Sequence, residues 1–170
     1  MLSTHPLSRS FPAPAHARAR LRLAPALLTG GAVIALGDFI GCLAFWSPHG
    51  VTALRVLQGV AAGLLGADAY HAGVPAAVLG ALLQWGIGAA FVLAYAGVAR
   101  HAPQLLQRPR HGIAYGLLLY LLMNRVVVPL SAFPQPAQPD PAWMLAGIPM
   151  FAGFGLVAAL FARSALPARA

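Results

Sequence analysis

The sequence contains no lysine and no glutamate, and its only acidic residues are three aspartates. Charged residues make up 8% of the 170 residues, whereas the usual share in soluble domains is about 25%. Hydrophobic residues make up 59%. So few charges cannot cover the surface of a soluble fold, and so many hydrophobic residues exclude a disordered chain.

Cysteine is nearly absent as well. The single cysteine, Cys42, excludes an intrachain disulfide framework. Residues 39–41 before it faintly resemble a lipoprotein cleavage site, but Asp38 interrupts the apolar run and apolar residues continue after Cys42. We therefore interpret Cys42 as a small residue within a helix.

Motifs of common enzymes are also missing. The sequence has no phosphate-binding glycine loop, no H-E-x-x-H motif and no G-x-S-x-G motif. Asp38 lies in an apolar run with no obvious titratable partner other than an arginine, so acid–base catalysis lacks a second group. We expect a protein that is not an enzyme and that binds no cofactor.

Long apolar runs are what the sequence does contain. A helix needs about 20 apolar residues to cross a bilayer, and the runs are too long and lack the alternation of strands. The predicted spans are 25–46, 74–99, 112–132 and 142–162. We therefore predict an all-α polytopic membrane helix bundle with its transmembrane domain at 25–163, a flexible basic N-terminal tail at 1–24 and a C-terminal tail at 164–170.

The predicted spans begin at recognisable residues. Pro25, Pro75 and Pro141 each stand in a first turn, where N–H groups have no intrahelical partner. Asp140 occupies the N-cap position before Pro141. The acid-free segment 1–24 also has the composition of an organellar transit peptide, but the same arginine-only bias runs through the whole chain, which favours a tail.

The segment 51–66 divides into two faces on a helical wheel. Most of its leucines fall on one half, and Arg55, Gln58 and the glycines fall on the other. This pattern predicts a helix on the outer side that either lies at the membrane surface or enters the membrane as a re-entrant helix. Its glycine-rich side could instead pack against the bundle.

The net charge of +8 first suggests nucleic acid, but the positions of the arginines explain it differently. Nine of the eleven arginines fall on one side if all four spans cross the membrane. The other side carries Arg55, Asp68 and Asp140, and Arg125 lies within the third span. The positive-inside rule then places both termini in the cytoplasm. There the arginines attract anionic lipid headgroups, and no nucleic-acid partner is expected.

Tryptophans fit the same topology. Trp46 and Trp143 fall at the outer boundary, where amphipathic rings are stable, and Trp85 falls near the middle of the bilayer.

Ionisable residues inside a span are candidates for function. Asp38 lies eight residues before Trp46, about 12 Å below the outer boundary, on a face of small residues that points toward other helices. Arg125 lies at a similar depth in the third span, which predicts an ion pair with Asp38. In the alternative, the long stem of Arg125 carries its charge to the membrane surface.

Further polar residues lie at this depth. Gln84 in the second span and Tyr120 and Asn124 in the third join Asp38 and Arg125 in a predicted intramembrane polar cluster. The cluster is either a site for a small molecule or a proton, or a set of interhelical hydrogen bonds worth about 0.6 kcal/mol each.

Glycines four residues apart predict close helix packing. The pairs are Gly37 and Gly41, Gly59 and Gly63, and Gly112 and Gly116.

Three outer residues are weak metal-ligand candidates. His49, Asp68 and His71 have loose spacing, which favours ordinary loop residues, and we predict no metal site.

Two segments carry a family resemblance. RVLQGVAAGLLG at 55–66 and YGLLLYLLMN at 115–124, continuing to 129–131, are similar to uncharacterised four-span bacterial inner-membrane proteins, loosely the YagU-like family. The similarity covers about residues 30–134. It implies a bacterial cytoplasmic (inner) membrane and carries over no activity, cofactor or site residue.

Three classes of function remain open. The first is a non-enzymatic accessory or assembly component, which would contact lipid and either a second copy or another membrane protein. The second is a small transporter or channel subunit that uses the polar residues around Asp38. The third, a metal-dependent enzyme at the outer face, is disfavoured by the loose ligand spacing.

Overall fold

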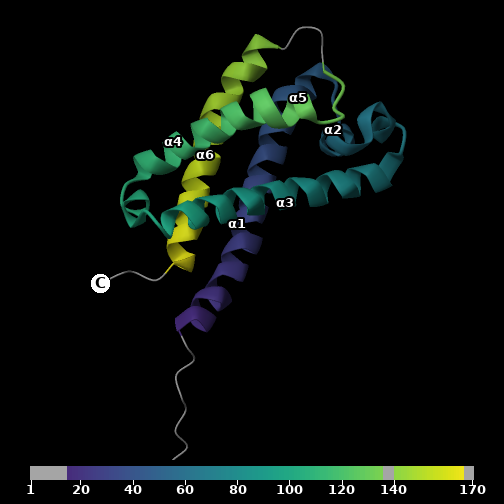
Figure 1. The fold of residues 1–170 in the computed structure, drawn as a ribbon. Coiled ribbons are helices and arrows are strands. Elements are labelled where there is room, and N and C mark those ends of the chain that lie inside the picture. Colours follow the sequence, from purple (N-terminus) through teal and green to yellow (C-terminus); the bar gives the residue numbers. More distant parts are fainter. Residues whose placement is uncertain (1–14, 136–139, 167–170) are drawn as a thin grey trace, which may run out of the picture.

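The computed structural model describes residues 15–135 and 140–166, with side chains from residue 23 onward (Figure 1). Within these ranges the chain is helical and contains no strand, which confirms the all-α class. The α-helices are α1 (Ala15–Trp46), α2 (Ala53–Leu65), α3 (Gly73–Ala99), α4 (Pro109–Leu122), α5 (Val128–Leu130) and α6 (Pro141–Ala165). The 3₁₀ segments are η1 (Ser47–His49), η2 (Gly66–Tyr70) and η3 (Pro103–Leu106), and a π-helix, η4 (Met123–Val127), joins α4 to α5.

Four segments are long and apolar enough to cross a membrane. They are Leu23–His49, Gly73–Ala99, Pro109–Leu130 and Pro141–Ala165. Each corresponds to one predicted span, and the third combines α4, η4 and α5. The helix predicted within 51–66 is present as α2.

The prediction for the start of the first helix was wrong. Helix α1 begins at Ala15, so part of the predicted tail 1–24 is helical and Pro25 lies inside the helix. Residues 15–24 are rich in alanine, arginine and leucine, which are strong helix formers. The Thr29 hydroxyl donates a 2.6 Å hydrogen bond to the carbonyl of Pro25. The rest of the predicted tail, 1–14, lies outside the described residues.

The other predicted helix starts are confirmed. Pro75 and Pro141 stand in the first turns of α3 and α6. The Asp140 carboxylate caps α6 by accepting hydrogen bonds from Ala142 N at 2.8 Å and Trp143 N at 3.2 Å. Helix α6 ends at Ala165, two residues into the predicted C-terminal tail, of which 167–170 lie outside the described residues.

Figure 1 shows α1 and α6 side by side, with α3 and α4 crossing them in this view. Helix α3 packs against α1, α2 and α6, whereas α4 packs mainly against α6. Residues from the early part of α1, the end of α3, η3 and the end of α6 pack together in one hydrophobic cluster. The start of α1 and the end of α6 therefore lie at one end of the bundle, and α2 and residues 131–135 lie at the other.

Helix α2 packs against α3 through Gln58 and its alanines. Gln58 is only 3% exposed and donates a 3.0 Å hydrogen bond to the carbonyl of Gly73. Leu54, Leu64 and Leu65 are exposed. Of the three sequence interpretations, packing of the Gln58 face against the bundle is the one observed.

The end of the bundle that carries α2 is closed by a few specific contacts. Ala132 N donates a 2.9 Å hydrogen bond to the carbonyl of Gly63, which ties the segment after α5 to α2. The Arg55 guanidinium lies 4.3 Å from the centre of the Tyr70 ring. Burial raises the pKa of Tyr70, and the nearby Arg55 charge partly offsets that rise.

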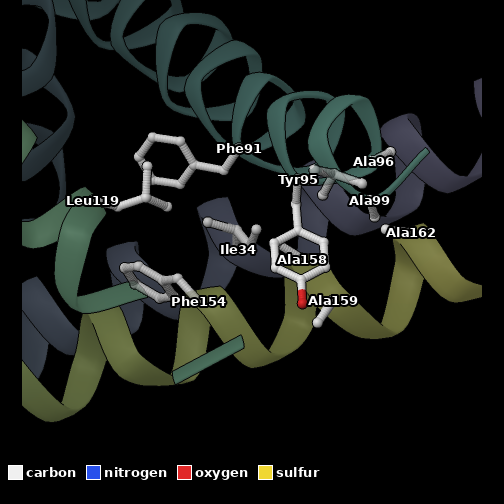
Figure 2. Packing of buried hydrophobic residues seen from close by; sticks show 11 residues of the cluster. Ile34, Phe91, Tyr95, Ala96, Ala99, Leu119, Phe154, Ala158, Ala159 and Ala162 are labelled. Carbon is white, nitrogen blue, oxygen red and sulfur yellow. The ribbon is translucent and has the colours of Figure 1, made fainter. Parts of the chain in front are cut away.

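Small residues let the helices approach closely. A Cβ atom added to Gly88 in α3 would lie 2.6 Å from the carbonyl oxygen of Gly31 in α1, so only glycine fits there. Gly112 and Gly116 of α4 face Gly155 of α6 in the same way, as their spacing predicted. Figure 2 shows the core beside these contacts, where Tyr95 lies beside Ala158 and Ala159 of α6 and Phe91 lies toward Leu119.

The other predicted glycine pairs contribute less. Gly41 closely faces the Met150 sulfur, but Gly37 makes only ordinary contact with Phe154. Gly59 and Gly63 also make only ordinary contacts. The bulky face of α1 turns outward, with Leu36 59% exposed, as the sequence predicted.

Candidate intramembrane polar site

Asp38 and Gln84 form the centre of the site. Asp38 lies on the small-residue face of α1, and Gln84 Nε2 on α3 donates a hydrogen bond to Asp38 Oδ2. The Cys42 thiol, one turn after Asp38, donates to the same oxygen at 3.6 Å. Within the described part of the chain, no hydrogen bond reaches Asp38 Oδ1. Two of the five predicted cluster residues are therefore in direct contact.

Both residues line a partly enclosed cavity of about 80 Å³. The cavity lies where all four membrane-spanning segments meet. Its other lining residues are Ile34 from α1, Ile87, Gly88 and Phe91 from α3, Met123 from η4, and Phe151 and Phe154 from α6. This volume holds a few water molecules or a small ligand.

The remaining wall of the cavity is apolar and largely aromatic. The Phe151 ring centre lies 5.3 Å from that of Phe154 and 6.4 Å from that of Phe91. Figure 2 shows Phe91, Ile34 and Phe154 turned toward a common space. The polar atoms contributed by the lining side chains are therefore those of Asp38 and Gln84.

Tyr120 and Asn124 are not part of this centre. The Tyr120 hydroxyl donates a 2.9 Å hydrogen bond to the carbonyl of Met144, which links α4 to α6. Asn124 is exposed, and its Nδ2 donates back to the carbonyl of Tyr120 at 2.9 Å. Both residues therefore serve helix packing and backbone satisfaction.

Arg125 is also separate from Asp38, and the predicted ion pair is not formed. Arg125 is exposed, whereas Met123 lines the cavity. Residues two positions apart on a helix do not face the same side, so Arg125 points away from the cavity that Met123 enters. The exposed position agrees with the alternative in which the long stem reaches toward the membrane surface.

A π-helix begins at Met123, the residue of this segment that lines the cavity. Pro129 has no N–H group and cannot continue an α-helical hydrogen bond to the carbonyl of Arg125. Val128 N instead bonds to the carbonyl of Met123, five residues back, which is the π-helical pattern. Pro129 was the visible signal for this change, and the sequence interpretation did not use it.

Sequence reasoning also missed the aromatic wall. Gln84, Gly88 and Phe91 have i, i+4 and i+7 spacing, which places them on one face of α3. Phe151 and Phe154 share a face of α6 at i, i+3. These spacings were readable, but only the packing shows which faces meet Asp38.

The outer metal-ligand candidates do not converge. Among the described residues, no group of three metal-ligating side chains is present. His49 Nδ1 lies 3.2 Å from the carbonyl of Phe45, and Asp68 and His71 are exposed. His49 instead joins an aromatic group in which the ring centres of Trp46 and Trp143 lie 5.6 Å apart.

Comparison of the chain with protein-family models, with curated proteins and with solved structures found no match. The resemblance to the YagU-like family therefore stays a prediction from the sequence.

Proposed function

We propose that the chain is an integral protein of the bacterial cytoplasmic membrane with both termini in the cytoplasm. The four apolar segments and the positions of the arginines support this proposal. Arg100 and Arg108 lie between α3 and α4, and Arg110 lies in the first turn of α4. Arg163 lies in the last turn of α6, at the end of the bundle where α1 begins. These charges are suited to anionic lipid headgroups at the cytoplasmic face.

Within that membrane, the chain acts as a non-enzymatic small transporter or channel subunit. The observation that carries this proposal is the position of Asp38 at a cavity bounded by all four spans, without a cationic partner among the described residues. An ionised carboxylate inside a bilayer costs about 3 kcal/mol or more. A proton or a bound cation removes that cost, so Asp38 is suited to exchange one for the other.

An accessory or assembly role is the second candidate. Two observations favour it: the glycine-mediated contacts of α1 with α3 and of α4 with α6, and the link between Asp38 and Gln84. In that role, Asp38 is an interhelical contact, and asparagine would serve nearly as well. Its partner would be a second copy of the chain or another membrane protein.

Proton flux into proteoliposomes distinguishes the two roles. An imposed pH gradient and a pH-sensitive dye inside the vesicles report the flux. We expect Asp38→Asn to abolish the flux of the wild-type protein while its elution volume and thermal unfolding stay close to wild type. Asp68→Asn, the same chemical change at an exposed residue outside the spans, is the matched control and should behave as wild type. Equal flux in the wild type, both variants and empty vesicles would reject the transport proposal.

A further inference from the structure

We propose that the cavity beside Asp38 binds a small alkylammonium cation, with one positive charge and about five non-hydrogen atoms. This inference rests on the proposed function and names the class of ligand for the same site. It depends on the charge of the cavity, the chemistry of its wall and its volume.

The charge of the site selects a monovalent cation. The lining residues include one carboxylate, Asp38, and no cationic side chain. Both hydrogen bonds to that carboxylate among the described residues fall on Oδ2, so Oδ1 keeps its capacity to accept or to pair with a charge. One bound positive charge therefore neutralises the site, whereas a divalent cation would leave an excess charge in the bilayer.

The wall selects an organic cation over a metal ion. Hard cations need six or more oxygen ligands, and the side chains here supply the oxygens of Asp38 and Gln84 alone. The wall instead presents Phe91, Phe151 and Phe154. Aromatic faces attract alkylammonium groups through their ring quadrupoles, most strongly where water is excluded. The Met123 side chain adds a polarisable thioether to this surface.

The volume limits the ligand to a small one. A cavity of about 80 Å³ holds a few waters, and thus a cation the size of tetramethylammonium. Tetrabutylammonium carries the same charge but is far larger than this volume. The two probes therefore separate binding in the cavity from general attraction to a lipid or detergent surface.

Protons compete with such a ligand for Asp38. The lining residues from α3, η4 and α6 include no titratable group, and Cys42, on α1 itself, is the titratable group that contacts Asp38. Arg125 in η4 is exposed and faces away from the cavity. The cation should therefore bind more weakly as the pH falls and Asp38 becomes protonated.

Calorimetric titration in nanodiscs of zwitterionic lipid tests the proposal. We expect the wild-type protein to bind tetramethylammonium but neither tetrabutylammonium nor sodium, and Asp38→Asn to abolish binding. Phe151→Leu keeps an apolar side chain but removes an aromatic ring from the wall. We expect it to raise the Kd for tetramethylammonium about tenfold. The matched control is Phe161→Leu, an aromatic residue of α6 that does not line the cavity and should leave the Kd unchanged.

The outcomes separate this inference from the proposed function. If the wild type binds no tetramethylammonium but retains Asp38-dependent proton flux, the ligand class is wrong and the proposed function stands. If both the binding and the flux are missing, both proposals fail. Equal affinity of the wild type and Asp38→Asn, or equal effects of Phe151→Leu and Phe161→Leu, would also overturn the cavity as the binding site. Preferential binding of sodium would replace the organic cation with a metal ion.

Discussion

Asp38 differs from the other two aspartates of the chain in its surroundings. Asp140 caps α6 through backbone N–H groups, and Asp68 is exposed in η2. Asp38 lies within a membrane-spanning helix, and Gln84 is its partner on another helix. Gln84 is therefore the residue that holds the carboxylate in place across the α1–α3 interface.

Removal of the Gln84 amide tests whether the fold depends on its hydrogen bond to Asp38. We expect Gln84→Leu to lower the free energy of unfolding by about 1–3 kcal/mol, because the half-buried Asp38 carboxylate loses its hydrogen-bond donor on α3 and keeps only the Cys42 thiol. Gln104→Leu changes an exposed glutamine in η3 and should have little effect. Thermal unfolding in detergent measures both.

A double variant completes this test. In the Gln84→Leu background, Asp38→Ala should restore most of the lost stability, because the carboxylate that lost its Gln84 donor is then absent. If Gln84→Leu alone leaves the free energy of unfolding unchanged, the hydrogen bond between Gln84 and Asp38 does not contribute to stability.

The sequence could identify Asp38 and Gln84 but not their true neighbours. An ionisable or amide group within an apolar run is visible in the sequence, and its depth follows from the helical rise. The direction of Arg125 was not visible in the same way, because Met123, two residues earlier, lines the cavity and Arg125 is exposed. Two residues at the same depth in the membrane therefore need not be in contact, because each can lie on a face of its helix that is turned away from the other.

At the scale of elements, glycines set how closely helices pack. Gly155 of α6 lies against Gly112 and Gly116 of α4, where an added Cβ would collide with backbone atoms. Gly153, two residues earlier on the same helix, has open space where its Cβ would be. Both glycines lie inside α6, and they differ in whether another helix packs against them.

A matched pair of substitutions tests this difference. Gly155→Ala should lower stability by about 1–3 kcal/mol, because the backbones must separate to admit a methyl group. Gly153→Ala should be neutral or slightly stabilising, because alanine is the better helix former. Unfolding midpoints of the two variants in the same detergent provide the comparison, and equal effects would contradict close α4–α6 packing.

Helix boundaries and caps followed from local chemistry more reliably than helix contacts did. Asp140 and Pro141 start α6 where their capping roles predict. Pro25 gave the wrong start for α1, because favourable helix formers on its N-terminal side carry the helix through the proline. Contacts such as α4 on α6 were beyond sequence reasoning, since several apolar helices offer similar small-residue faces.

At the scale of the whole molecule, the outward faces are apolar around the bundle. Leu36 and Ile40 on α1, Leu82 on α3 and Leu118 on α4 are all more than half exposed. Lipid covers such surfaces in a membrane protein, and this explains how a chain with 8% charged residues remains folded. We propose that the charge asymmetry sets the direction in which the bundle is inserted.

Cysteine labelling tests that direction. In a Cys42→Ser background, Ser47→Cys places the only thiol after α1, and Gln104→Cys places it between α3 and α4. We expect a membrane-impermeant maleimide added to intact cells with a permeable outer envelope to label Ser47→Cys and to spare Gln104→Cys. The reverse pattern would invert the topology, and labelling of both would mean that α3 does not cross the membrane.

The most direct test of the intramembrane site is the carboxyl NMR signal of Asp38. Because the chain has three aspartates and no glutamate, selective ¹³C-aspartate labelling gives three side-chain carboxyl resonances, which Asp→Asn variants assign. We expect the Asp38 resonance to move both with pH and with added tetramethylammonium, while those of Asp68 and Asp140 do not respond to tetramethylammonium. An Asp38 resonance that stays fixed under both titrations would show a purely structural carboxyl group and would contradict a proton or cation site in this membrane domain.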